Sequence, residues 1–441
     1  MVLSMELNNP KTINAWCMYD WANSVYSLVI TSAIFPIYYN AVTTSSDGSD
    51  VVNFFGWNVS NSVLYSYSLS FSFLFVAAIL PILSGIADYG GKKKFFMKIF
   101  VYIGSFSCIG LYFFTGDNIE WAIICSVLAS VGYSGSLVFY DAFLPEIASE
   151  DRFDKVSAKG YSLGYIGSVI LLILNLVMIE MYDVFGFADK GIATRFAFLT
   201  VGVWWLGFSQ LTFLRVPDNV YNLKERTNLF TEGYKELRKV WRAVKEERMT
   251  KLFLLAFFFY NMGVQTVMYL AATFGAKELE LESSQLIITV LLIQIVAIAG
   301  AYGFAHLSNI KGNKFSLLTM VFIWIFVCLG AYFVYNANEF YLLAFVVGLV
   351  MGGIQSLSRS TFAKLIPENT IDHASYFSFY DVTYNLSIVV GTFSYGLIDQ
   401  ITNSMRNSTL ALMLFFLVGM GFLLLLKLPD HLKRKPYTGN T

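Results

Sequence analysis

Residues 84–93 of this chain read SGIADYGGKK, and residues 305–314 read AHLSNIKGNK. Asp88 and Asn309 occupy matching positions in the two stretches and are 221 residues apart. A second motif, LPE at residues 144–146, recurs as IPE at residues 366–368, a separation of 222 residues. Because two unrelated motifs repeat at nearly one separation, the sequence indicates an internal duplication of one unit in the same orientation.

Long apolar runs lie around these motifs. A helix needs roughly 20 apolar residues to cross a bilayer core of about 30 Å, because backbone polar groups in lipid must be satisfied within the segment. The predicted spans cover residues 16–40, 63–87, 96–115, 121–144, 158–179, 194–213, 251–274, 285–306, 315–335, 340–361, 376–398 and 409–426. The sequence therefore predicts an all-α integral membrane protein with twelve transmembrane helices in two six-helix bundles.

Composition supports this class and excludes others. Hydrophobic residues make up 56% of the 441 residues and charged residues only 14%, whereas soluble domains carry about 25% charged residues. With a formal net charge of zero and no basic domain, nucleic acid is not an expected partner. Phosphate-cradling loops, metal-spaced His and Glu pairs and a nucleophile elbow are all absent from the sequence, so we expect neither an enzyme nor a bound cofactor or metal.

The basic residues predict the orientation. With the N-terminus inside, Lys and Arg lie on the cytoplasmic side apart from Lys190, Arg195, Lys277 and Arg406, as the positive-inside rule requires. We therefore expect a multi-pass protein with both termini in the cytoplasm. Its membrane would be the inner or plasma membrane of a bacterium, or the vacuolar membrane of a eukaryote.

A polar linker divides the predicted bundles. We expect an N-terminal six-helix bundle at residues 1–213, a cytoplasmic linker at 214–250 and a C-terminal six-helix bundle at 251–441. Apolar linker residues recur at helical spacing between basic ones, which predicts an amphipathic helix on the inner membrane surface. A solvated basic linker is the alternative. The apolar positions are Phe230, Tyr234, Leu237, Trp241 and Val244.

The duplicated turn resembles a known signature. Asp88, Gly91, Lys92 and Lys93 resemble the loop between the second and third helices of the major facilitator superfamily. The resemblance implies that this loop acts as a latch that holds one closed state. Ser84 and Tyr89 depart from the usual pattern, and the second copy has Asn309 in place of the aspartate, so we expect the latch mainly in the first copy.

Three dispersed motifs resemble a narrower branch. YDWANS at residues 19–24, GYSLGYIG at 160–167 and GGIQSLSRS at 352–360 resemble the vacuole effluxer-like autophagy-related permeases. Eukaryotic members of that branch are associated with amino-acid export from the vacuole. The resemblance implies amino acids as candidate substrates, and the glycine-rich fifth helix is similar to that of exporters of the superfamily.

A charged residue inside a span costs about 2.5–3.5 kcal/mol to insert, so such residues are typically paired, turned to a cavity or functional. Asp20, Asp141, Arg359 and Asp381 all lie within about two turns of the expected cytoplasmic helix ends. We interpret them as a charge network whose pairing changes between transport states, with one aspartate accepting a proton if transport is proton-coupled. The alternative is a static pair between Arg359 and an aspartate, with Asp20 and Asp141 in water at the headgroup level.

Polar residues at helical spacing indicate the substrate cavity, because residues three, four and seven apart share a helix face. Such stripes fall on the opening helices of the three-helix units, which line the central cavity in the resembled superfamily. The alternative is that the serines only bridge packed helices. The cavity candidates are Asn23, Ser27, Asn261, Gln265, Tyr269 and Gln355.

Together these features predict a secondary active transporter that moves a small organic solute by alternating access. We expect it to work as a monomer, with the solute, the bilayer and protons as its partners. The alternative from another class is a membrane receptor or scaffold that has a transporter fold and moves no solute.

Overall fold

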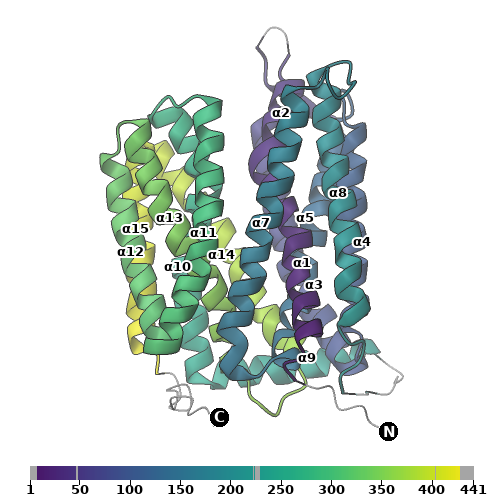
Figure 1. Cartoon of the computed structure of the whole chain (residues 1–441), viewed down its shortest axis with the longest axis vertical. Coiled ribbons are helices and arrows are strands. Elements are labelled where there is room, and N and C mark those ends of the chain that lie inside the picture. Colours follow the sequence, from purple (N-terminus) through teal and green to yellow (C-terminus); the bar gives the residue numbers. More distant parts are fainter. Residues whose placement is uncertain (1–6, 46–47, 222, 224–228, 403, 428–441) are drawn as a thin grey trace. The chain divides into compact units, whose positions relative to one another are not determined.

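The computed structural model describes residues 7–45, 48–221, 223, 229–402 and 404–427. Helices make up nearly all of this part of the chain, as Figure 1 shows. The first half contains α1 (Pro10–Val25), the π-helix η1 (Tyr26–Ile34), α2 (Phe35–Thr43), β1 (Val51–Phe54), β2 (Trp57–Ser60), α3 (Asn61–Gly90), α4 (Lys93–Gly110), the 3-10 helix η2 (Leu111–Phe113), α5 (Ile119–Asp141), α6 (Leu144–Ile147), the 3-10 helix η3 (Glu150–Arg152), α7 (Phe153–Glu180) and α8 (Lys190–Arg215). After it come α9 (Leu229–Glu246), α10 (Arg248–Glu278), α11 (Ser283–Lys311), α12 (Asn313–Phe333), α13 (Ala337–Leu365), α14 (His373–Thr402) and α15 (Met405–Leu425).

Each predicted span contains a helix. Within the described residues, eleven helices are long and apolar enough to cross a membrane. The run predicted at residues 376–398 is α14, which has span length at 30 residues but is too polar to be counted among the eleven. The prediction of an all-helical membrane protein is therefore confirmed.

Two compact units make up the structure, and each takes a short segment from the other half of the sequence. The first unit consists of Met1–Ser149, Leu163–Val240 and Asn369–Val389. The second unit consists of Glu150–Ser162, Trp241–Glu368 and Val390–Thr441. As a result, α7 begins in the second unit and continues in the first, whereas α14 begins in the first unit and continues in the second.

The first span is one helical run with a change of helix type inside it. η1 separates α1 from α2 over nine residues with π-helical hydrogen bonding. Pro36, the second residue of α2, has no N–H to donate to the preceding turn. The Ser32 hydroxyl donates to the Ser27 carbonyl at 3.0 Å, five residues earlier, which matches the i→i+5 spacing of a π-helix.

A β-hairpin that the sequence analysis did not predict follows the first span. β1 and β2 pair antiparallel with Val51 opposite Ser60 and Phe54 opposite Trp57. The two turn residues, Phe55 and Gly56, have φ angles of +48° and +84°. Two positive φ angles in a two-residue loop match the twist of the flanking strands. The hairpin is thus a small β addition to the all-α prediction.

Glycines set the closest helix approaches in the second unit, where α11 packs on α13. A Cβ at Gly300 would lie 2.0 Å from the Leu349 carbonyl oxygen, and one at Gly352 would lie 2.0 Å from the Ala297 carbonyl oxygen. Glycine on both helices lets the two backbones touch, which is a common source of dispersion energy between membrane helices.

Helix α9 fits the amphipathic prediction only in part. On the side that faces α3, the carbonyl oxygen of Gly233 lies where a Cβ of Gly85 would approach it to 2.3 Å. Val240 and Val244 are buried, whereas Tyr234 and Trp241 are exposed. The apolar positions of α9 therefore divide between a packed face and an exposed face. The side chain of Phe230 lies outside the described part of the chain.

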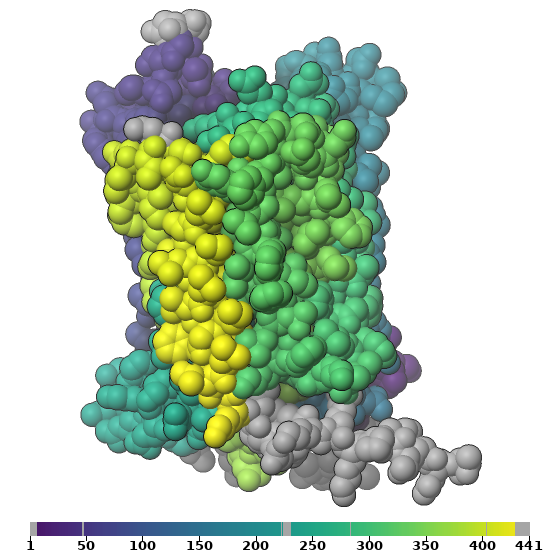
Figure 2. All heavy atoms as spheres, turned by 90° about the vertical axis from the view of Figure 1, so that its left-hand side faces the viewer, coloured from purple at the N-terminus to yellow at the C-terminus, as the bar shows by residue number. Residues whose placement is uncertain are grey.

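Helix α15 exposes apolar side chains on the surface of the second unit. It packs on α10 and α12, where Trp324 stacks on Phe416 at 5.4 Å. Figure 2 shows α15 in yellow on the surface beside the green helices of the same unit. Leu414 and Leu424 are exposed on this helix, at 59% and 58%. In a protein that crosses a bilayer, lipid chains cover such side chains.

Adding one methyl group at Gly300 tests the α11–α13 approach. We expect Gly300→Ala to lower the stability by about 1–3 kcal/mol, because the new Cβ forces the backbones apart. Thermal unfolding of the purified protein in detergent measures this loss. Gly303→Ala on the same helix is the control, because nothing lies within 4 Å of its Cβ. Equal melting temperatures for the two variants would contradict the prediction.

Candidate functional site

The turn between α3 and α4 has a backbone conformation that requires glycine. Gly91 has φ +64°, and the Lys92 N–H donates to the Ala87 carbonyl at 2.8 Å, which closes the end of α3. A Cβ at Gly91 would also lie 2.6 Å from Asn219 Oδ1. Because the turn is this tight, Asp88 on the last turn of α3 faces Lys93 at the start of α4, with 3.6 Å between Oδ1 and Nζ.

Asp88 caps the start of α14. Its carboxylate accepts hydrogen bonds from the backbone N–H of Ala374 at 3.1 Å and of Ser375 at 2.7 Å. These N–H groups belong to the first turn of the helix, where no intrahelical acceptor exists and the helix dipole is positive. Asp88 is only 1% exposed, so the contact is shielded from water. We call this contact the first latch; all of it lies within the first unit.

Further buried charges surround the first latch. Lys93 Nζ contacts Glu146 Oε1, and His373 Nδ1 lies 3.3 Å from the same oxygen. Glu146 comes from α6 and is the acid of the duplicated LPE motif. Its two partners come from α4 and α14, so one carboxylate joins three elements. Buried charges persist when each has a partner of opposite charge or a hydrogen bond, which this cluster supplies.

Asp372 connects α9 to the start of α14. Lys239 Nζ donates to its Oδ2 at 3.0 Å, and its own N–H donates to Thr370 Oγ1 at 3.1 Å. Burial and the negative charge of Asp88 raise the pKa of Asp372 to about 6, against the lowering effect of Lys239. This carboxyl group therefore changes charge near physiological pH.

The predicted latch residues have distinct positions. Asp88 and Lys93 lie in the buried cluster, and Gly91 shapes the turn. Lys92 is half-buried at the first position before α4, where its carbonyl accepts from the Phe96 N–H at 3.1 Å. Two of the four predicted residues thus carry charge into the site.

The first-helix motif and the glycine-rich motif pack on each other in the first unit. Asp20 is 4% exposed and accepts a 2.8 Å hydrogen bond from the Tyr140 hydroxyl. A Cβ at Gly164 would lie 2.4 Å from Ser24 Oγ, and one at Gly167 would lie 2.9 Å from the Trp21 carbonyl oxygen. The glycines therefore let α7 lie directly against the helix that carries Asp20.

The remaining charges of the predicted network lie in both units. Asp141 and Asp381 are buried in the first unit, and Asn385 Nδ2 donates to Asp381 Oδ2 at 3.0 Å. Arg359 belongs to the second unit. There its Nε donates to Ser157 Oγ at 2.9 Å, and its guanidinium lies 4.2 Å from the ring centre of Tyr161.

The cavity candidates also lie in both units. Asn23 is buried, and its Nδ2 has no hydrogen-bond partner among the described residues. Gln265 Nε2 donates to Asn261 Oδ1 at 3.3 Å. Ser27 lies in η1, and Tyr269 and Gln355 are half-buried. Asn23 and Ser27 belong to the first unit, and Asn261, Gln265, Tyr269 and Gln355 belong to the second.

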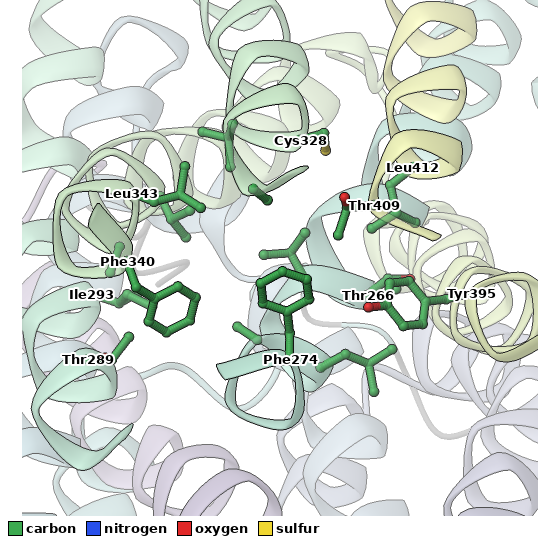
Figure 3. A pocket seen from close by; sticks show the side chains of 17 residues that line it. Thr266, Phe274, Thr289, Ile293, Cys328, Phe340, Leu343, Tyr395, Thr409 and Leu412 are labelled. Atoms are coloured by element: carbon green, nitrogen blue, oxygen red, sulfur yellow. The ribbon is translucent and has the colours of Figure 1, made fainter. Parts of the chain in front are cut away.

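An apolar cavity of about 60 Å³ lies inside the second unit. Figure 3 shows Phe274 pointing into it, and Phe340 stacks on Phe274 at 6.3 Å. An engineered cavity of about 150 Å³ just holds benzene, so this one is too small for an organic solute. Its wall is almost entirely apolar, and such cavities stay dry. We therefore assign it to packing and not to substrate.

No metal site is formed by the described residues, since no three of their His, Cys, Asp or Glu side chains could hold an ion. Cys17, Cys108, Cys125 and Cys328 are buried and form no disulfide among the described residues.

Sequence reasoning missed several charged residues of the site. Asp372 ends a short polar loop and His373 begins α14, at a place with no motif of its own, and Lys239 is one of several basic residues on α9. A signal existed for Asp372 and His373, because they lie at the helix start that a latch aspartate would cap. Only the folded chain shows that Lys239 reaches Asp372.

Three comparisons place this chain among known proteins. Residues 8–433 match the family described as vacuole effluxer Atg22-like. The uncharacterized MFS-type transporter YxiO of Bacillus subtilis is 32% identical over 412 residues, which cover 93% of this chain and 93% of YxiO. Autophagy-related protein 22 of Kluyveromyces lactis is 24% identical, over 82% of this chain and 79% of that protein.

A solved structure has the same fold. The crystal structure of the major facilitator superfamily transporter FucP in the outward conformation aligns with a TM-score of 0.70 at 13% identity. The alignment covers 96% of this chain and 99% of FucP. At this identity the likeness shows the fold alone.

The raised pKa of Asp372 predicts a pH effect. Because the docked carboxyl group binds its proton more tightly than a detached one, docking contributes most stability below about pH 4 and loses it as pH rises through about 6. We expect the melting temperature of the wild type to fall relative to Asp372→Asn between pH 5 and 7. Thermal unfolding at a series of pH values measures this difference.

The control for this series is Glu232→Gln, which removes the acid of the exposed Lys235 pair on the same helix. It should keep the pH slope of the wild type. If the melting temperature of Asp372→Asn falls with pH as steeply as that of the wild type, other groups cause the pH effect.

Proposed function

This chain belongs to the vacuole effluxer Atg22-like family of major facilitator superfamily transporters, and we propose that it exports a small organic solute by alternating access. Neutral amino acids are the substrate class that we propose. The family description as an effluxer supports the direction. The resemblance of the three dispersed motifs to permeases associated with amino-acid export supports the substrate class.

The observation that carries the proposal is the first latch. Asp88 from the first half of the sequence holds the start of α14 from the second half through two N–H groups. A carboxylate at a helix start contributes up to about 2 kcal/mol. A free energy of this size is enough to favour the state in which the contact forms. It is also small enough for the binding of a solute to offset it. Such a contact suits a protein that must open and close repeatedly.

We propose the bundles 1–213 and 251–441 as the two moving parts, with the linker 214–250 and both termini in the cytoplasm. The exposed Tyr234 and Trp241 of α9 would then meet the headgroups of the inner leaflet. The source decides between a bacterial plasma membrane, which the Bacillus relative favours, and a vacuolar membrane, which the fungal relatives favour.

For the solute we propose contacts with Asn23, Ser27, Asn261, Gln265, Tyr269 and Gln355. The buried Nδ2 group of Asn23, which has no hydrogen-bond partner among the described residues, supports a polar ligand at that position. For proton coupling we propose Asp20, Asp141 and Asp381, together with Arg359. All four side chains are buried, which supports their inclusion, because buried charged groups in a membrane protein are typically paired or functional.

Counterflow in proteoliposomes tests transport and substrate class together. We expect vesicles loaded with an unlabelled neutral amino acid to accumulate the same labelled amino acid faster than unloaded vesicles. In Asp20→Asn we expect counterflow to persist and uptake driven by a pH gradient to stop, because exchange needs no proton release. Binding of amino acids without counterflow would instead indicate a receptor. Gradient-driven flux in Asp20→Asn would exclude Asp20 as proton carrier.

Neutralising Asp88 tests the first latch. We expect Asp88→Asn to reduce counterflow about tenfold while the amount of folded protein stays within about twofold, because the capping charge acts on one state of the cycle. Asp183→Asn, which changes an exposed aspartate, is the control. Wild-type counterflow in Asp88→Asn would remove this residue from the mechanism.

A further inference from the structure

The second copy of the duplicated turn has no aspartate of its own, yet a buried carboxylate reaches it. Asp154, on the first turn of α7, is 1% exposed. It accepts hydrogen bonds from Ser308 Oγ at 2.8 Å and Asn313 Nδ2 at 2.9 Å, which both belong to the second copy of the turn. Lys364 at the end of α13 donates to it at 2.7 Å. All four residues lie in the second unit.

The duplication relates this contact to the first latch. Asp154 and Ser375 are 221 residues apart, the same separation as Asp88 and Asn309. Ser375 donates its N–H to Asp88 in the first copy. In the second copy the aspartate lies at the helix start and the amide lies on the turn. Both copies therefore join a helix start to the duplicated turn, with the carboxylate on the turn in the first copy and on the helix start in the second.

The cation has moved as well. Lys93 faces Asp88 in the first copy. Its counterpart Lys314 donates instead to the Leu424 carbonyl at 2.8 Å. Lys364 takes over its role, since it binds both Asp154 and, at 2.8 Å, Asn313 Oδ1. The Oδ1 atom of Asn309 is buried and has no hydrogen-bond partner among the described residues, so this position of the turn no longer carries the contact.

One face of α7 continues the contact for two more turns. Arg359 donates to the oxygen atoms of Ser157, and Ser157 Oγ donates to the Ser356 carbonyl at 2.8 Å. Ala158 packs against Ala301 and Ala305 of α11. Polar groups dominate this face, and water can replace each of their hydrogen bonds when the helices separate. The face is thus suited to reversible docking.

We propose that Asp154 forms a second latch, in which the start of α7 docks on α11 and α13 through a carboxylate placed opposite to that of the first latch. The proposal rests on alternating access, since opening requires the start of α7 to leave the second unit. It differs from the expectation that the latch function resides mainly in the first copy, because it gives the second copy a latch of its own.

Hydrogen–deuterium exchange of the full-length protein in nanodiscs tests the proposal without any substrate. We expect Asp154→Asn to raise the exchange rate about fivefold in residues 150–162 and also in residues 369–380, because both latches favour the same state. Asp88→Asn should give the same pattern. A rise confined to residues 150–162 would show that Asp154 is only a local structural residue and would overturn the proposal.

Moving the carboxylate across the contact is the sharper test. Asp154→Asn removes the acid, and Asn313→Asp alone sets a second negative charge against Asp154, so each should loosen the latch. The double variant Asp154→Asn, Asn313→Asp places the carboxylate on the turn, as in the first copy, and should return exchange to within about twofold of the wild type. A double variant no better than Asp154→Asn would overturn the proposal.

Size-exclusion chromatography identifies any variant that fails to fold. Asp154→Glu is then tested in place of that variant, and it should keep part of the slow exchange of the wild type. If no amino acid gave counterflow, the proposed substrate class would be rejected. The exchange experiment would still test the second latch, because hydrogen exchange needs no solute. Slow exchange that does not differ among the wild type and all variants would overturn the second latch itself.

Discussion

A helix that begins inside a protein leaves backbone N–H groups without intrahelical acceptors, and this constraint organises the site. α14 begins among buried residues, and Asp88 supplies the missing acceptors for Ala374 and Ser375. A buried carboxylate itself needs compensation, which Lys93 provides. Lys93 in turn binds Glu146, and Glu146 contacts His373 beside the helix start. The connected cluster of charged residues therefore compensates the unpaired N–H groups at the start of α14.

The contacts of α7 and α14 explain why each compact unit contains a segment from the other half of the sequence. Each of these helices starts in one unit and continues in the other, and polar side chains hold each start in place. The remaining helix contacts are closer and mostly apolar, as at Gly300 and Gly352, where backbones touch. Polar contacts, whose hydrogen bonds water can replace, thus lie at the starts of α7 and α14. Close apolar contacts lie between the other helices.

Much of the fold follows from the sequence because the bilayer restricts what a spanning segment can be. The helices were predictable on that basis, and the repeated motif singled out Asp88 as a candidate site residue. The π-helical turn at Tyr26–Ile34 was not, because it alters the face on which Ser27 lies without altering composition. The hairpin after the first span depends on two positive φ angles, for which Gly56 was the visible signal. Asp154 was hidden within the charged run of residues 150–155, which has the composition of a surface loop. The aspartates and Arg359 lie in separate units, so their relation as a network stays a prediction.

The opposite placement of Asp88 and Asp154 also constrains the history of the duplication. Asp88 corresponds to Asn309 and Asp154 to Ser375, so the two halves have come to differ at both ends of the contact since they duplicated. Ser308 and Asn313 are neutral, so the charge at position 154 is balanced by Lys364 from another helix and not by the turn itself.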